Sequence, residues 1–345
     1  MHGRCAWRWG FLVAVAMLAA VATPSRPAVG AESAVVIMYH RFGEGTYPST
    51  NIRLNQFENH LAILADRPNT VLPLPEIVAA LKPGRSLPEG AVGITIDDAY
   101  LSVYTEAWPR LKAAGLPFTL FVATEAIDKK RRGYMTWDQI RELAAAGVTI
   151  GSQTATHLHM AAADAGRARA DIAASNVRFA AELGAPPALF AYPYGEASLE
   201  TMAITREAGF SAAFGQHSGV AAPSDDPYYL PRFAMNENYA DGSRFRLAIN
   251  AKPLVVSDLI PADPMVRDIN PPPVGFTVTA PRAGLGRLAC YISHEGQARL
   301  ERLGEHRVEV RFKKPLPRGR TRLNCTLPGD KAGQWYWFGR QFYVK

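Results

Sequence analysis

Two adjacent carboxylates, Asp97 and Asp98, are the side chains of this 345-residue sequence whose position most strongly indicates chemistry. They follow a short apolar run at 92–96 and precede a segment with helical apolar spacing that ends at Gly115. A buried strand that leads through acids into a helix is typical of catalytic sites at the carboxyl ends of parallel strands. Neighbouring strand residues point to opposite sides, so the two acids can take different roles. The alternative is an ordinary helix N-cap, where Asp is also favoured.

A metal site is the chemistry that Asp98 predicts in combination with His157, because a carboxylate and a neutral imidazole are good ligands for zinc or a similar divalent cation. Gln153, four residues before His157, is the candidate third ligand, although an amide oxygen is a weaker ligand than an imidazole. His159 is the alternative if this segment is extended. Asp97 would then act as the general base, because a carboxylate beside a cation has a lowered pKa and can take a proton from water.

A leaving amine must also be protonated, and His217, at the end of a predicted strand, is the candidate general acid. Taken singly, these residues have ordinary explanations. His157 or His217 alone is consistent with an exposed loop residue, Arg232 with a surface ion pair, and 193–195 with a simple turn. Their order on successive strand ends favours one shared site instead.

Strand and helix patterns alternate from about residue 35 to residue 235, and these elements must position the polar side chains. The alternation predicts an α/β fold with a parallel sheet, and the number of strands favours a barrel-like closure. The carboxyl ends of parallel strands share one rim, so residues that follow the strands should converge there. The predicted strands are 35–39, 92–96, 117–123, 148–152, 188–192, 210–214 and 228–233.

Three stretches resemble motifs of the polysaccharide deacetylase family, also called carbohydrate esterase family 4, with its NodB-homology domain. They are 94–100 (Ile-Thr-Ile-Asp-Asp-Ala-Tyr), 150–157 (Ile-Gly-Ser-Gln-Thr-Ala-Thr-His) and 191–195 (Ala-Tyr-Pro-Tyr-Gly). Residues 38–40 and 230–233 are also similar to segments that flank the family's groove. The resemblance covers roughly residues 35–240.

The resemblance implies a distorted (β/α)7 barrel that hydrolyses N-acetyl groups on a polysaccharide with zinc or another divalent cation. It implies that Asp97 is the base and that Asp98 and His157 are metal ligands. It also implies that the backbone N–H of Tyr194 faces the oxyanion. The residues expected to contact the substrate are His40, Pro193, Tyr194, Gly195 and Arg232.

The sequence departs from the family pattern at four points. Gln153 stands where the family has its first metal-binding histidine, and Ala191 stands where many members have an arginine that tunes the base. Ala99 replaces a glycine, and the late Leu-x-His motif that carries the general acid is missing. The exchange of an imidazole for an amide predicts a loss of metal affinity, or a third ligand supplied by Gln153 or His159.

The sequence pattern changes near residue 251. Five short runs of strand-like alternation follow, with turn residues between them. This pattern predicts a small all-β sandwich of the immunoglobulin type. Cys290 and Cys325 fall on two of its strands, which favours a disulfide that staples the two sheets over two free thiols. The predicted domains are therefore 32–250 and 251–345.

Residues 1–31 read as a secretory leader with two early arginines, an apolar run at 11–21 and small residues at 29–31. The run is short for a membrane span. The leader holds three arginines and no acid, so its removal lowers the formal charge from +7 to +4. This mild excess, without a run of basic residues, does not favour nucleic acid as a partner. The expected location is the periplasm or the cell surface.

The leading hypothesis is an exported, metal-dependent deacetylase that acts on an acetylated polysaccharide. The alternative is a protein of the same fold that binds glycan without hydrolysing it, which Gln153 favours and Asp97 opposes. A third hypothesis is a hydrolase that uses the same site on an O-acetyl ester or another amide, since a fold alone does not fix the substrate.

Overall fold

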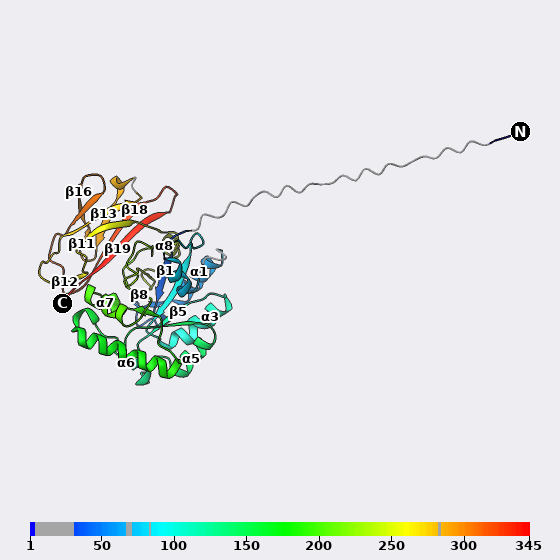
Figure 1. The fold of residues 1–345 in the computed structure, drawn as a ribbon, viewed down its shortest axis with the longest axis horizontal. Helices are drawn as coiled ribbons and strands as arrows, with labels where there is room; N and C mark the ends of the chain where they lie inside the picture. The colour runs from blue at the N-terminus through cyan, green and yellow to red at the C-terminus, as the bar shows by residue number, and fades with distance from the viewer. Residues whose placement is uncertain (4–30, 67–70, 83, 282–283) are drawn as a thin grey trace.

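The computed structural model describes residues 1–3, 31–66, 71–82, 84–281 and 284–345, and Figure 1 shows their arrangement. The predicted leader lies almost entirely outside these residues. The chain forms an α/β part, coloured blue to green in Figure 1, and an all-β part, coloured yellow to red. Among the described residues, no helix combines the length and the apolarity needed to cross a bilayer.

A seven-stranded parallel sheet forms the centre of the α/β part, as the strand and helix pattern predicts. Its central strands are buried on both faces, which explains their continuous apolar runs. The order is β8-β7-β6-β5-β4-β1-β9. The strands are β1 (Val35–Tyr39), β4 (Val92–Asp97), β5 (Thr119–Val122), β6 (Thr149–Ser152), β7 (Leu189–Ala191), β8 (Ala212–Phe214) and β9 (Phe233–Ala234).

The two edge strands, β8 and β9, are joined through the segment 230–232. Leu230 donates a backbone hydrogen bond to Ala213 (2.9 Å) and accepts one from Gly215 (2.9 Å). Two residues later, the Arg232 N–H donates to the carbonyl of His217 (2.9 Å). The sheet is therefore a curved, incomplete barrel whose gap is spanned by one irregular segment.

Helices cover the outside of this sheet and pack their apolar faces against it. The helix α5 (Trp137–Ala145) begins with a capping box formed by Thr136 and Gln139. The longest helix, α6 (Ala165–Leu183), ends at Gly184, whose φ of 86° lies in the left-handed region. The others are α1 (Leu54–Ala65), α2 (Leu74–Ala80), α3 (Trp108–Ala113), α4 (Thr124–Asp128), α7 (Leu199–Glu207) and α8 (Gly242–Ile249).

The segment after Asp98 differs from the single helix that its apolar spacing predicts. It forms a π-helical turn at Val103–Ala107 and only then continues as α3. Ser102, just before the turn, accepts a hydrogen bond from the backbone N–H of Phe42 in the short strand β2 (Arg41–Phe42). Strand β2 pairs with β3 (Asn51–Ile52) outside the main sheet.

The all-β part consists of two sheets around one apolar core, which matches the runs predicted after residue 251. Its assignment to the immunoglobulin type remains a prediction. One sheet holds β10 (Lys252–Pro253), β19 (Trp335–Val344), β18 (Gly319–Pro328), β14 (Ala289–Ile292), β15 (Gly296–Gln297) and β12 (Met265–Val266). The other holds β11 (Val255–Ile260), β13 (Val274–Ala280), β17 (Arg307–Arg311) and β16 (Arg299–Leu303).

A disulfide joins Cys290 and Cys325, as predicted, but it does not staple the two sheets. The two cysteines are direct partners on the antiparallel neighbours β14 and β18 of a single sheet. The core between the sheets is instead filled by apolar side chains such as Phe276, Leu323 and Phe342.

The strand β19 carries much of the contact between the two parts of the molecule. The indole of Trp337 meets the ring of Phe233 edge-on, with ring centroids 5.1 Å apart. Gly339 lies so close to the backbone of Ser218 that a side chain at that position would collide with it. This close approach places residues of the all-β part beside the rim of the parallel sheet.

Candidate active site

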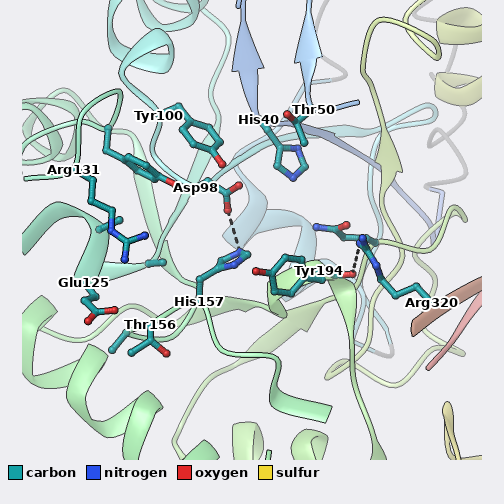
Figure 2. A pocket seen from close by; sticks show the side chains of 15 residues that line it. His40, Thr50, Asp98, Tyr100, Glu125, Arg131, Thr156, His157, Tyr194 and Arg320 are labelled. Carbon is teal, nitrogen blue, oxygen red and sulfur yellow. Dashed lines mark hydrogen bonds and ion pairs between the residues drawn. The ribbon is translucent and has the colours of Figure 1, made fainter. Parts of the chain in front are cut away.

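A cavity of about 390 Å³ opens at the carboxyl ends of the central strands (Figure 2). The segments after β1, β4, β5, β6 and β7 supply most of its wall, and one residue comes from the all-β part. The residues used below are His40, Asp98, Tyr100, His157, Tyr194, Gln216 and Arg320.

Asp98 and His157 form an ion pair in this cavity, with 3.2 Å between Oδ1 and Nε2. Burial opposes ionisation of Asp98, but the hydrogen bond with His157 and the nearby His40 outweigh it and lower its pKa to about 2. Burial likewise opposes charge on His157, and the contact with Asp98 raises its pKa. Both residues have a left-handed backbone, with φ of 75° for Asp98 and 57° for His157. Such strain is often stored at functional sites.

Gln153 lies beside this pair, as the sequence predicts. Its side chain has no exposed surface, and its Oε1 accepts a hydrogen bond from the backbone N–H of Asp98 (3.1 Å). Its Nε2 has no hydrogen-bond partner among the described residues. His159, the alternative third ligand, is occupied elsewhere: its Nδ1 lies 2.8 Å from Glu196, and its ring stacks on Tyr194.

This donor set fits a divalent cation, although it is poorer than that of most catalytic zinc sites. Asp98 Oδ1 is buried, and among the described residues its ion-pair contact is with the imidazole of His157. A carboxylate and an imidazole therefore converge, with the amide of Gln153 next to them. The described residues contain no group of three His, Cys, Asp or Glu side chains that would hold a metal. Catalytic zinc usually has three protein ligands.

Asp97 is fully buried behind the cavity and is held by Arg232. The guanidinium makes a bidentate contact, with 2.7 Å from Nη1 to Oδ1 and 2.9 Å from Nη2 to Oδ2. Arg232 also donates to the carbonyl of Gly215 (2.9 Å) and to Thr95 Oγ1 (3.1 Å). The prediction that Arg232 contacts substrate is wrong, because its side chain has no exposed surface.

The ion pair also accounts for the alanine at position 191. Ala191 is buried on β7, at the position where many members of the family that the sequence resembles have an arginine. In this fold, Arg232 reaches Asp97 from the segment between β8 and β9. The guanidinium that neutralises the buried acid therefore comes from a different part of the chain.

His40 connects Asp97 with the cavity. Its Nε2 lies 3.9 Å from Asp97 Oδ2, and its ring lines the cavity wall. Figure 2 shows the ring on the side of the cavity opposite His157. His40 is thus the cavity histidine that is not engaged with Asp98. The sequence predicts only a substrate contact for His40. Its position directly after the strand 35–39, at the same rim of the sheet as Asp97, is the signal for its place beside that carboxylate.

The turn Pro193–Gly195 places the ring of Tyr194 against His157, with centroids 4.5 Å apart. Tyr194 has a φ of 60°, and a Cβ at Gly195 would lie 2.5 Å from the backbone nitrogen of Gln216. The carbonyl of Tyr194 accepts hydrogen bonds from Gln341 Nε2 (3.1 Å) and Arg320 Nη1 (3.3 Å). Strands β18 and β19 of the all-β part therefore hold this turn, which sequence reasoning did not find.

His217, the predicted general acid, does not line this cavity. It is 5% exposed, its ring packs on Tyr229, and its Nδ1 has no partner among the described residues. Burial and the charges of nearby arginines lower its pKa to about 3. His217 does not border this cavity, and its lowered pKa disfavours the protonated form that a general acid needs, so the structure does not support it as the acid for this cavity.

Tyr100 and its neighbours form a wall of the cavity that the sequence did not reveal. The ring of Tyr100 packs on Tyr134, with centroids 4.8 Å apart, and the guanidinium carbon of Arg41 lies over the Tyr100 ring, 3.4 Å from its centroid. Burial and the charge of Asp98 raise the pKa of Tyr100, so the hydroxyl stays protonated and can donate to Asp98.

Residues 84–213, which include most of this cavity, match the family model described as polysaccharide deacetylase. This segment of the chain is therefore similar to the polysaccharide deacetylase family. The match and the relatives below place the chain among the hydrolases that act on non-peptide amide bonds. A curated relative is the poly-beta-1,6-N-acetyl-D-glucosamine N-deacetylase of Staphylococcus aureus, 22% identical over 233 residues, which are 60% of this chain and 80% of that protein.

Solved structures of deacetylases share the fold. IcaB from Ammonifex degensii is 28% identical with a TM-score of 0.54, and the match covers 63% of this chain and 98% of IcaB. The Streptococcus pyogenes deacetylase PplD, solved in complex with acetate, has a TM-score of 0.59 at 20% identity, with the same two coverages. Each of these two matches leaves more than a third of this chain without a counterpart.

Proposed function

We propose that this protein is a metal-dependent hydrolase that removes N-acetyl groups from an exported polysaccharide built from N-acetylhexosamine. The observation that carries the proposal is one cavity in which the Asp98–His157 pair faces His40, with Asp97 directly behind it. The relatives support the class of substrate, because one is named for deacetylation of a β-1,6-linked N-acetylglucosamine polymer.

The first part of the mechanism is activation of water. When bound, a divalent cation, for which zinc is our choice, would be held by Asp98 and His157 with the Gln153 amide beside it, and would polarise the amide carbonyl. We assign the proton of the attacking water to Asp97. This assignment requires that the buried carboxylate be reached from the cavity past the ring of His40, which lies 3.9 Å from it. Arg232 balances the charge of this buried carboxylate and fixes its orientation, so no rearrangement is needed when the proton arrives.

The second part is departure of the amine. Attack on the carbonyl carbon forms a C–O bond, the C–N bond breaks, and the amine nitrogen needs a proton. His40 supplies it, because its ring lies in the cavity and Asp97 stands 3.9 Å behind it. The turn around Tyr194 packs its ring against His157 and is the candidate for the oxyanion contact. Acetate and a glucosamine unit with a free amine are the products.

We further propose that residues 1–31 are an export leader, 32–250 the catalytic domain and 251–345 an accessory domain. The Cys290–Cys325 disulfide supports a location outside the cytoplasm, where such bonds persist. The all-β part contributes Arg320 and Gln341 to the Tyr194 turn, so we assign it a role in the active site.

Release of acetate from acetylated β-1,6-linked glucosamine oligomers by the purified chain tests this function. We expect turnover that stops with a chelator, returns with zinc, and is absent in Asp97→Asn. Metal content, measured by atomic emission, should match one ion per chain in both proteins. A chain that binds the ion and the oligomer but releases no acetate would overturn the proposal.

Gln153 favours a second candidate, a deacetylase-fold protein that binds glycan without turnover. Its amide occupies a place where an imidazole would hold the cation more tightly. That candidate predicts oligomer binding with no metal bound and no acetate released. A third candidate, hydrolysis of O-acetyl esters, predicts acetate release from acetylated hydroxyls and none from N-acetyl groups.

A further inference from the structure

A second cavity of about 390 Å³ lies where the two parts of the molecule meet. The α/β part supplies Gln216, Tyr239 and Arg244 to its wall, and the all-β part supplies several residues of β14, β18 and β19. Gln216 also lines the active-site cavity, so one side chain borders both. The second cavity therefore lies next to the first, at a spacing that one polymer chain can span.

Aromatic side chains form much of this second cavity. Tyr239 and Tyr291 are 49% and 46% exposed, which is high for such large rings in a folded chain. Trp337 is held in place by its contact with Phe233 and by a 3.3 Å hydrogen bond from its Nε1 to Asn324. Exposed, fixed aromatic rings with a few polar groups between them are typical of ligand-binding surfaces.

Two arginines in the same cavity have no acidic partner. Neither Arg244 nor Arg322 forms an ion pair with a carboxylate among the described residues, and the Nε of each is buried without an acceptor. Arg244 lies over the ring of Tyr239, 4.9 Å from its centroid. Burial lowers the pKa of both guanidinium groups. No Asp or Glu lines this cavity, so the charge of the two groups is left uncompensated.

A ligand that carries a carboxylate would supply what this cavity lacks. Guanidinium groups bind carboxylates through paired hydrogen bonds, and the aromatic rings offer flat apolar faces to a sugar ring. A neutral sugar would leave the two charges without a counterion. The arrangement therefore favours an acidic sugar over a neutral one.

We propose that the second cavity binds an acidic sugar unit of the same polymer whose N-acetylated unit occupies the active site. The inference rests on the proposed deacetylase function and deepens it: the substrate is an acidic heteropolymer that contains N-acetylhexosamine and carboxylated sugars. The all-β part then selects the polymer as well as holding the Tyr194 turn.

Binding of two oligosaccharide probes of equal length tests the inference. One is a hyaluronan octasaccharide, in which N-acetylglucosamine alternates with glucuronic acid, and the other is fully acetylated chito-octaose, which is neutral. We expect the wild-type chain to bind the acidic probe at least tenfold more tightly by titration calorimetry at moderate salt. Equal affinity, or preference for the neutral probe, would overturn the acidic assignment.

Variants then locate the binding. Arg244→Gln combined with Arg322→Gln should remove the preference for the acidic probe and leave the affinity for chito-octaose within twofold. The matched control is Lys313→Gln with Lys314→Gln, which removes two charges from exposed residues of the all-β part away from this cavity. A control that loses the preference equally would show general charge attraction and would overturn the inference. Arg322→Lys, which keeps the charge, should retain part of the preference if the arginine variants are folded.

A catalytic assay separates failure of this inference from failure of the proposed function. Acetate release from di-N-acetylchitobiose, which is neutral and offers no acidic unit to the second cavity, should be unchanged in the double arginine variant. If the wild-type chain hydrolyses this disaccharide but prefers no acidic probe, only the inference fails. If it binds the acidic probe through the two arginines and hydrolyses nothing, only the proposed function fails.

Discussion

The guanidinium of Arg232 donates hydrogen bonds to both carboxylate oxygens of Asp97 in a fully buried, bidentate ion pair. The two residues are 135 positions apart in the sequence, and the contact forms because β9 lies beside β1 and β1 beside β4. Two desolvated charges satisfy each other here, and removal of one partner leaves the other uncompensated. The first prediction follows from this pair.

Arg232→Gln should destabilise the chain by about 3–5 kcal/mol, because Asp97 would remain buried without its counterion. Urea unfolding followed by circular dichroism measures the change. The double variant Arg232→Gln with Asp97→Asn should recover part of the lost stability, since it removes the unpaired charge. Additive losses in the two single variants and the double variant would contradict a direct coupling.

Asp97→Asn and His40→Gln should both lower kcat, for different reasons. We expect a loss of at least ~10³-fold for Asp97→Asn and ~10²-fold or more for His40→Gln, in line with general acid–base contributions. An activated aryl acetate has a leaving group that needs no proton. His40→Gln should therefore lose far less on that ester than on the amide, while Asp97→Asn loses activity on both. Equal losses on the two substrates would remove His40 as the acid.

Gln153→His should tighten zinc binding, because an imidazole is a stronger ligand than an amide. We expect a gain of roughly tenfold or more, a scale comparable to the effect of residues around metal sites, by competition with a fluorescent chelator. His159→Ala is the matched control and should leave the affinity unchanged, since His159 is paired with Glu196. No gain in Gln153→His would mean that residue 153 points away from the ion.

Gln341→Leu should lower kcat about tenfold on long and short substrates alike, with little change in KM. The variant removes one of the two donors to the Tyr194 carbonyl, and the turn would lose part of its orientation. Stability should change little, because the other side-chain atom of Gln341, Oε1, has no partner among the described residues. Gln297→Leu, on the exposed strand β15, serves as the control. A changed KM at constant kcat would argue for a substrate contact instead.

The chain should become less stable as the pH falls from about 6.5 toward 4. The neutral ring of His60 bridges the Tyr39 hydroxyl and the Ala240 carbonyl in the core. Burial lowers the pKa of His60 to about 4. The unfolded chain takes up a proton near 6.5 that the folded chain refuses, so stability present above that pH is lost below it, by up to ~3 kcal/mol. His60→Gln should show a flatter pH profile of unfolding free energy. Parallel profiles would exclude His60 as a cause.

The roles of residues that lie within one local motif could be predicted from the sequence. The pair Asp97–Asp98, the strand β4 before it and the capping box of α5 all depend on neighbours along the chain, and local patterns carry that information. The placement of Gln153 and His157 near Asp98 followed from one general rule, that parallel strands bring their carboxyl ends to one rim.

The partners of those residues were decided by the tertiary structure. Arg232 is 135 positions from Asp97, and Gln341 is 147 positions from Tyr194. Whether such side chains meet depends on the curvature of the sheet and on how β18 and β19 dock against it, which no local pattern encodes. The same holds for His217: its strand end was placed correctly, but its ring packs on Tyr229 and does not line the active-site cavity. The sequence by itself determined which groups could react, and the long-range packing decided which of them face one another, because only the folded chain sets the distances between residues that are remote in sequence.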